Sequence, residues 1–162
     1  LRLEGRPDKA QGFYERSLEY SPNMQKTKRE YVAALLEQRK YDEALGKAKE
    51  NFDSSPENTY HIHAYFRCLI KKIGLTIEEI ETLKYLIDLV GKSHSPKKQE
   101  LVTAMNLEYD IIIAPKPIEQ LLQDISKAES QFPQSPNVGR VISEFKFKQK
   151  IISSRYSYRE DC

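Results

Sequence analysis

Apolar residues recur at helical spacing along most of the chain, with charged residues between them. The segment KREYVAALLEQRK is typical, because Tyr31, Val32 and Leu35 fall on one side of a helix and charged side chains on the other. No convincing strand-like alternation competes with this pattern. The pattern predicts seven full helices, preceded by one or two partial turns, at residues 28–40, 41–52, 59–72, 76–90, 95–113, 118–132 and 135–153.

The predicted helix ends carry local signals. A turn at Arg39 and Lys40 is so short that the helices before and after it must fold back as an antiparallel hairpin. Gly74 interrupts the apolar pattern after the third helix. Thr76, with Glu79 three residues later, predicts a capping box at the start of the fourth helix.

Serine-proline pairs predict two further helix starts. Ser95 is expected to cap the fifth helix, with Pro96 at its first position, and Ser135 marks the start of the last helix.

Two stretches of the chain match each other, each matched pair being separated by 34 residues. A lone helical hairpin cannot bury its apolar faces, so hairpins of this length are expected to stack. Alanine lets two helices approach closely where they cross, and proline ends a helix. The matched pairs are Asp8 and Asp42, Ala10 and Ala44, Leu18 and Phe52, Ser21 and Ser55, and Pro22 and Pro56.

Helical hairpins at this spacing resemble tetratricopeptide repeats. That family has a small residue at the start of the second helix of each unit, an aromatic residue four positions later, and a proline at the end. Ala48 stands in place of the second unit's aromatic residue, and Val32 and Phe66 replace glycines of the family pattern, so wider or rotated packing is expected there. The matching positions are Ala10, Tyr14 and Pro22 in the first unit and Ala44 and Pro56 in the second.

The resemblance implies an all-α fold, an α-α superhelix or solenoid of antiparallel hairpins with irregular C-terminal repeats. It implies one domain over residues 1–162. Residues 1–72 carry the clearest repeats, 76–134 form divergent hairpins, 135–153 form a capping helix and 154–162 form a tail.

Composition narrows the protein class. The chain is 31% charged and 39% hydrophobic, with six glycines and no tryptophan, which is typical of a water-soluble helical protein. No apolar run approaches the roughly 20 residues that a membrane-spanning helix needs, so no membrane association is expected. Cys68 and Cys162 lie too far apart to suggest a disulfide framework, which favours the reducing cytoplasm. Because the chain opens with Leu1 inside an incomplete repeat, we interpret it as part of a longer protein.

Sequence motifs for catalysis are absent. The sequence contains no Gly-rich phosphate loop, nucleophile elbow or HExxH motif. His61 and His63 are two positions apart, so on a helix they point about 200° apart and cannot bind one metal ion. We therefore expect no catalytic residue, no metal site, no cofactor and no enzymatic activity in this segment.

Basic residues recur on the predicted third helix, where His63, Arg67 and Lys71 are spaced every four residues. The 34-residue shift places Lys26 and Arg29 on the corresponding face of the preceding hairpin. The first helix of each tetratricopeptide unit lines a concave groove, so the resemblance implies a basic, aromatic-flanked patch that suits an acidic segment or a C-terminal carboxylate. A solvated helix face is the alternative interpretation. The patch residues are Lys26, Arg29, Tyr60, His63, Arg67 and Lys71.

These observations predict a scaffold that binds a protein or peptide through its groove, as the sensing, docking or regulatory part of a larger cytoplasmic protein. One alternative is a helical regulatory region of a multidomain ATPase or nuclease effector. Another is a nucleic-acid-binding repeat, suggested by the basic, tyrosine-containing segment KFKQKIISSRYSYREDC. Lys146, Lys148 and Lys150 spread around a helix rather than line up, so nucleic acid is the less favoured partner. The oligomeric state stays open.

Overall fold

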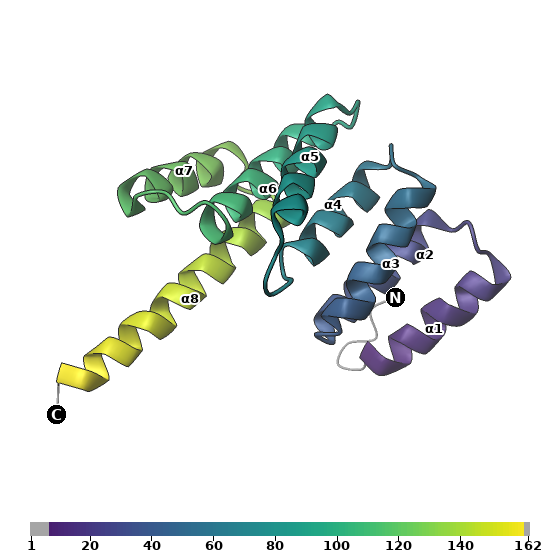
Figure 1. Cartoon of the computed structure of the whole chain (residues 1–162), viewed down its shortest axis with the longest axis horizontal. Helices are drawn as coiled ribbons and strands as arrows, with labels where there is room; N and C mark the ends of the chain where they lie inside the picture. The colour runs from purple at the N-terminus through teal and green to yellow at the C-terminus, as the bar shows by residue number, and fades with distance from the viewer. Residues whose placement is uncertain (1–6, 161–162) are drawn as a thin grey trace. The chain divides into compact units, whose positions relative to one another are not determined.

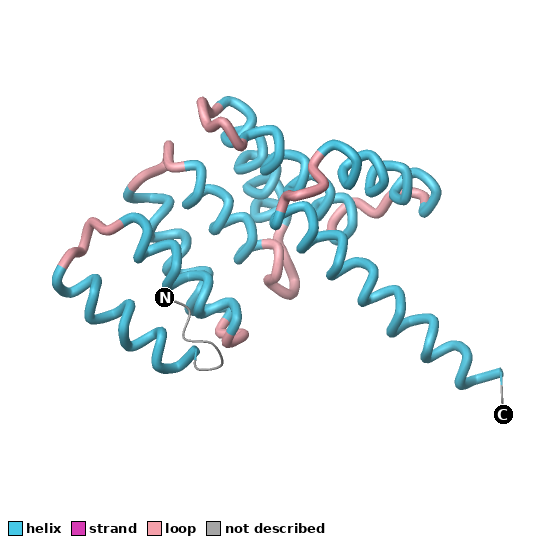
Figure 2. The backbone as a smooth tube through the Cα atoms, turned by 180° about the vertical axis from the view of Figure 1, so that it is seen from behind, coloured by secondary structure: helices cyan, strands magenta, loops and turns pink. Residues whose placement is uncertain are grey.

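The computed structural model describes the backbone of residues 7–160 and the side chains of residues 9–154. Within these limits the chain forms eight helices and no strand, joined by short loops (Figure 2). The helices are α1 (Pro7–Tyr20), α2 (Gln25–Glu37), α3 (Tyr41–Ser54), α4 (Thr59–Leu69), α5 (Ile77–Lys92), α6 (Lys98–Ile112), α7 (Ile118–Gln131) and α8 (Pro136–Glu160) (Figure 1).

The chain divides into two compact units, Leu1–Ser95 and Pro96–Cys162. In the first unit each helix from α1 to α5 packs on the next, and α2 additionally contacts α4. The core of this unit consists of apolar side chains from all five helices, since the helical stripes predicted from the sequence face one another. Its largest fully buried members are Phe66, Leu35, Ile62, Leu83, Leu86, Val32 and Val90.

The structure differs from the sequence prediction at the start of the chain. The expected partial turns are wrong, because Pro7–Tyr20 forms a 14-residue helix. Ala10 and Tyr14, only 5% and 8% exposed, form its buried face. Phe13 between them is exposed, and this outward apolar residue blurs the stripe from which a helix is recognised.

The residues of the 34-residue repeat occupy corresponding places in α1 and α3. Ala44, like Ala10, is buried near the start of its helix. Pro22 and Pro56 are exposed and each lies two residues beyond a helix end.

The turn between α2 and α3 lies where the sequence predicts it. Arg39 has a φ of 58°, the left-handed conformation in which many helices end. Its N–H donates to the carbonyl of Leu36 at 3.0 Å, and the N–H of Lys40 donates to that of Leu35 at 3.0 Å. This pair of bonds is a Schellman motif with arginine in the place that glycine usually takes.

The predicted capping box at the start of α5 is confirmed. The hydroxyl of Thr76 accepts the N–H of Glu79 at 3.2 Å, and the Glu79 carboxylate accepts the N–H of Thr76 at 2.9 Å. Just before it, Gly74 has a φ of +71°, which agrees with the predicted interruption.

The predicted cap of α6 is wrong. This helix begins at Lys98, with Lys97 at the N-cap position and no side-chain capping bond, while Pro96 lies in a turn. The Ser93 hydroxyl ends α5 by donating to the carbonyl of Val90 at 2.7 Å, and it accepts the N–H of Ser95 at 3.4 Å. Ser93 therefore closes the preceding helix.

The second unit has its own core, in which α6 contacts both α7 and α8. Ser135 starts α8 as predicted, since its hydroxyl accepts the N–H of Val138 at 3.1 Å. The same hydroxyl donates to Glu100 of α6 at 2.6 Å, which fixes the start of α8 on α6. The buried core residues are Ala104, Leu107, Leu121, Ile125, Ala128, Val138, Val141 and Ile142.

The last helix is longer than predicted. It continues past residue 153 to Glu160, so the expected tail at 154–160 is wrong, and residues 161–162 lie outside the described part of the chain. No glycine or proline occurs between residues 140 and 160 to end the helix earlier.

The all-α prediction is confirmed, with consecutive helices packed within each unit. The superhelical arrangement and the single continuous domain stay predictions. No helix within residues 7–160 is both long and apolar enough to cross a bilayer.

Candidate binding surfaces

The predicted patch is divided among two helices and a turn of the first unit. Lys26 and Arg29 lie on α2, whereas Tyr60, His63 and Arg67 lie on α4. Lys71 lies beyond the end of α4 at Leu69, so the four-residue stripe does not continue on the helix to its last member. Because α2 contacts α4, residues about 34 positions apart come to one surface.

Arg29 and Tyr60 are in direct contact across the two helices. The guanidinium carbon of Arg29 lies 4.6 Å from the centre of the Tyr60 ring, within the range of a cation–π interaction. Tyr60 is still 47% exposed, and Lys26 is exposed beside Arg29 on α2. The guanidinium of Arg29 also lies 3.9 Å from the carboxylate of Glu30.

His63 differs from the other patch residues because it is only 7% exposed. Arg67, one helical turn later, is half-buried, as is Lys71. His63 is therefore buried beneath the other patch residues' surface and offers little area for contact with a partner. The remaining residues are called the α2–α4 surface: Lys26, Arg29, Tyr60, Arg67 and Lys71.

A neighbouring histidine that the sequence analysis treated only as a poor metal ligand joins the two helices. His61 is 1% exposed, and its Nε2 atom is hydrogen-bonded to the side chain of Gln25 in the first turn of α2. Its Nδ1 atom has no partner within the described residues. Burial, with smaller contributions from the positive charges of Lys28 and Arg29, lowers the pKa of His61.

Cys68 lies on the same helix but is not a chemical site. It is a free thiol, 1% exposed, and burial raises its pKa to about 12. A thiol of this kind is unreactive at neutral pH. In the part of the chain that the structure describes, no group of three or more His, Cys, Asp or Glu side chains is placed to hold a metal ion.

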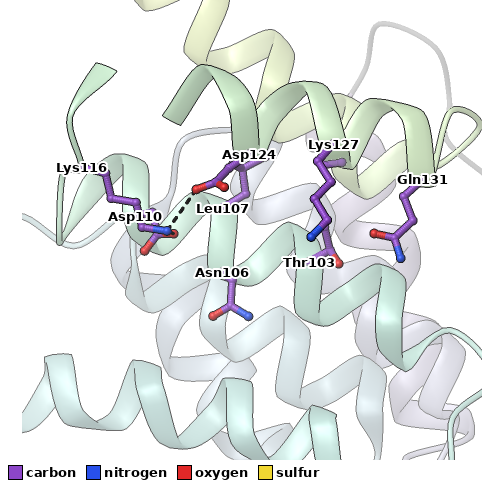
Figure 3. A pocket seen from close by; sticks show the side chains of 9 residues that line it. Thr103, Asn106, Leu107, Asp110, Lys116, Asp124, Lys127 and Gln131 are labelled. Atoms are coloured by element: carbon purple, nitrogen blue, oxygen red, sulfur yellow. Dashed lines mark hydrogen bonds and ion pairs between the residues drawn. The ribbon is translucent and has the colours of Figure 1, made fainter. Parts of the chain in front are cut away.

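A pocket of about 460 Å³ lies in the second unit, between α6 and α7 (Figure 3). The pocket was not predicted from the sequence, because its walls come from two helices and the connection between them. Polar side chains dominate the lining, and Leu107 and Ala128 provide its apolar part. The lining residues are Thr103, Asn106, Leu107, Asp110, Lys116, Asp124, Lys127, Ala128 and Gln131.

One end of the pocket is an ion-pair cluster. The ammonium of Lys116 lies 2.7 Å from Asp110 and 3.1 Å from Asp124, and Gln120 donates to the other oxygen of Asp124 at 3.1 Å. The hydrogen bond from Lys116 is the largest effect that lowers the pKa of Asp124. The hydrogen bonds to Asp110 and Asp124 raise the pKa of Lys116, so its ammonium stays charged at neutral pH.

Comparison with known proteins leaves the family open. No family model matches the chain, and no significant match was found among curated proteins or solved structures. The resemblance to tetratricopeptide repeats therefore stays a prediction from the residues that carry it.

Proposed function

We propose that this chain is a protein-binding scaffold module that holds an acidic segment of a partner protein on the α2–α4 surface. The observation that carries the proposal is the stacking of Arg29 on Tyr60 between two helices that are not consecutive in the chain. In a stack of helical hairpins, the first helix of each unit lies beside the first helix of the next, and these helices line the binding face. The contact of α2 with α4 supports this arrangement.

The chemistry of the α2–α4 surface favours a carboxylate-bearing ligand. The contact with Tyr60 positions the Arg29 side chain, and its guanidinium carries N–H groups that can donate to a ligand. These groups form bidentate, charge-assisted hydrogen bonds with carboxylates. Lys26, Arg67 and Lys71 add positive charge along the same surface, while the half-exposed Tyr60 ring offers an apolar contact.

The packing of this surface limits the entropy cost of binding. The helices that carry it are held by the core of the first unit and by the hydrogen bond between the buried His61 and the side chain of Gln25. Little of the surface needs to be ordered when a partner binds, so side-chain complementarity decides specificity. We further propose that the module acts within a larger cytoplasmic protein, since two cysteines far apart in the sequence do not suggest a disulfide framework.

Fluorescence anisotropy with a labelled peptide rich in Asp and Glu, ending in a free carboxylate, tests the proposal. The double variant Arg29→Glu plus Arg67→Glu is expected to weaken binding at least about tenfold, since each charge-assisted hydrogen bond contributes roughly 1.5–3 kcal/mol. The matched control is Lys9→Glu plus Lys84→Glu, which makes the same charge change at exposed lysines of α1 and α5. The control is expected to bind the acidic peptide more tightly than the test variant does, with an affinity close to that of the unaltered protein.

Two results would contradict the proposal. One is an equal loss of binding in the test and control variants, which would indicate only long-range charge attraction. The other is tighter binding of a single-stranded RNA of matched length than of the acidic peptide, which would favour the nucleic-acid alternative instead.

A further inference from the structure

We propose that the pocket between α6 and α7 binds a small zwitterion, with an ammonium group and a carboxylate on a short backbone, as in a free amino acid or a short peptide. This site is separate from the α2–α4 surface and goes beyond the proposed function. Its volume of about 460 Å³ lies within the range of about 300–1,000 Å³ that is usual for small-molecule sites. Its polar lining excludes the largely apolar ligands that such sites often take.

The acidic end of the pocket suits the ammonium group. Asp110 and Asp124 share the single ammonium of Lys116, so this cluster keeps one net negative charge. Asp110 is half-buried and faces the pocket from α6. A ligand ammonium placed here would complete the charge balance as the second cation of the cluster.

The other end suits the carboxylate. Lys127 lies one turn after Asp124 on α7, and Figure 3 shows its ammonium directed toward α6, beside Thr103. No ion pair of Lys127 is found within residues 9–154, and its charge acts on Asp124 only at longer range, where it contributes to lowering the pKa of that carboxyl. Gln131 on α7 and Asn106 on α6 add amide donors to the same pocket.

Ligands with only one kind of charge match only one end of the pocket. A phosphate or other simple anion at Lys127 would leave the net negative charge of the Lys116 cluster unbalanced, and a simple cation at Asp110 would leave Lys127 unbalanced. Between the ends, Leu107 and Ala128, 4% and 3% exposed, form an apolar floor for a short backbone or a methyl group. A dipolar ligand matches both charges at once.

Amide chemical shifts measured by NMR on the full chain provide the test. The probes are alanine, dialanine and trialanine as free zwitterions, which distinguish an amino-acid ligand from a short peptide by length. At least one is expected to shift the amides of residues 103–110 and 124–131 with a dissociation constant on the order of 1 mM, equivalent to about 4 kcal/mol. N-acetylated and C-amidated forms of the same probe are expected to bind about tenfold more weakly, since each loses one charge-assisted interaction.

Two charge-removing variants assign the ends of the ligand. Lys127→Gln is expected to weaken binding of the free probe about tenfold. Binding of the amidated probe is expected to stay unchanged, because that probe has no carboxylate to interact with Lys127. Asp110→Asn is expected to weaken the free probe and to leave the acetylated probe unchanged by the same reasoning. Lys84→Gln in α5 is the matched control, with unchanged binding of every probe.

Absence of shifts with all three zwitterions would overturn the proposal, as would equal binding of free and blocked probes. Shifts confined to α2 and α4 would overturn it too, while leaving the proposed function intact. Because the alanine probes carry no acidic side chain, failure here does not affect the acidic-peptide test of the α2–α4 surface.

Discussion

Single polar residues join helices that are distant in the sequence. Tyr31 of α2 donates a hydrogen bond to Glu15 of α1 at 2.9 Å, and burial together with that bond raises its pKa to about 12. In the second unit, Arg140 of α8 forms a two-bond ion pair with Glu108 of α6, at 2.9 and 3.3 Å. Such pairs restrict which helix faces can meet, because an unpaired buried polar group is costly.

The ion pair of Glu108 and Arg140 predicts a large asymmetry between variants. The Glu108 side chain is 3% exposed, and Glu108→Ala is expected to lower the free energy of unfolding by about 3–5 kcal/mol, because it leaves Arg140 partly buried without its main partner. The double variant Glu108→Leu plus Arg140→Met is expected to lower the free energy of unfolding clearly less, since it removes both charges. Urea denaturation measures both, and a single variant no less stable than the double variant would refute this account.

His61 predicts a stability change at mildly acidic pH. Its pKa in the folded chain is lowered, whereas in the unfolded chain it is near the ordinary value of about 6.5. The unfolded state therefore binds more protons as the pH falls below about 6.5, and the free energy of unfolding decreases toward the folded-state pKa. Above about pH 6.5 the contribution of His61 to the free energy of unfolding is fully present.

Comparing variants isolates this effect. His61→Gln is expected to flatten the decrease in unfolding free energy between about pH 7 and pH 5, the region where an ordinary histidine titrates. The control, His94→Gln, alters an exposed histidine and is expected to keep the wild-type slope. Identical slopes for the two variants would show that His61 is not the group responsible.

At the level of helices, the turn after α2 stores a small amount of backbone strain. Arg39 adopts a left-handed conformation, which costs roughly 1–2 kcal/mol for a residue with a Cβ atom. Glycine relieves this strain in the folded state, but it also makes the unfolded chain more flexible, which offsets part of the gain. Arg39→Gly is therefore expected to raise the free energy of unfolding by about 0.5–1 kcal/mol. Thermal denaturation checks this, with Gln38→Gly as a control that is expected to destabilise, because Gln38 has an ordinary right-handed φ of −78°. A loss of stability in both variants would contradict the assignment.

Helices with continuous apolar stripes were predictable from the sequence. The segment around Leu35 and the one around Leu86 have both helical periodicity and flanking turn signals, and the structure places helices there. The first helix was missed because the exposed Phe13 disturbs its stripe, and the cap of α6 was misplaced because Ser93 and Ser95 compete for nearby backbone groups. Such competition is settled by the surrounding backbone, not by the local sequence.

The binding surfaces were predictable only in part. The 34-residue shift paired Arg29 with His63 and Lys26 with Tyr60, whereas the contact in the structure joins Arg29 to Tyr60. The repeat therefore indicated which two helices meet, but not which side chains touch. The burial of His63 did not follow from its spacing, because helical position alone does not say how deeply a neighbouring helix covers a face. The α6–α7 pocket depends on Lys116 in a connecting loop reaching Asp124, a contact without any periodic signal.

At the level of the whole molecule, two compact units present chemically different surfaces. The first unit carries the basic and aromatic α2–α4 surface, and the second carries a pocket with separated charges. The central claim is that the first unit recognises acidic segments through that surface. A scaffold of this kind needs no chemical change in its ligand, because recognition by a preformed surface is sufficient.

Mapping the bound acidic peptide by amide chemical shifts on the full chain tests this claim most directly. The account predicts the largest shifts at residues 25–33 and 59–67, with the Tyr60 ring signals moving together with the backbone amides, and small shifts in α6 to α8. Shifts centred on α8 or the α6–α7 pocket, or no shifts under conditions where anisotropy reports binding, would contradict it.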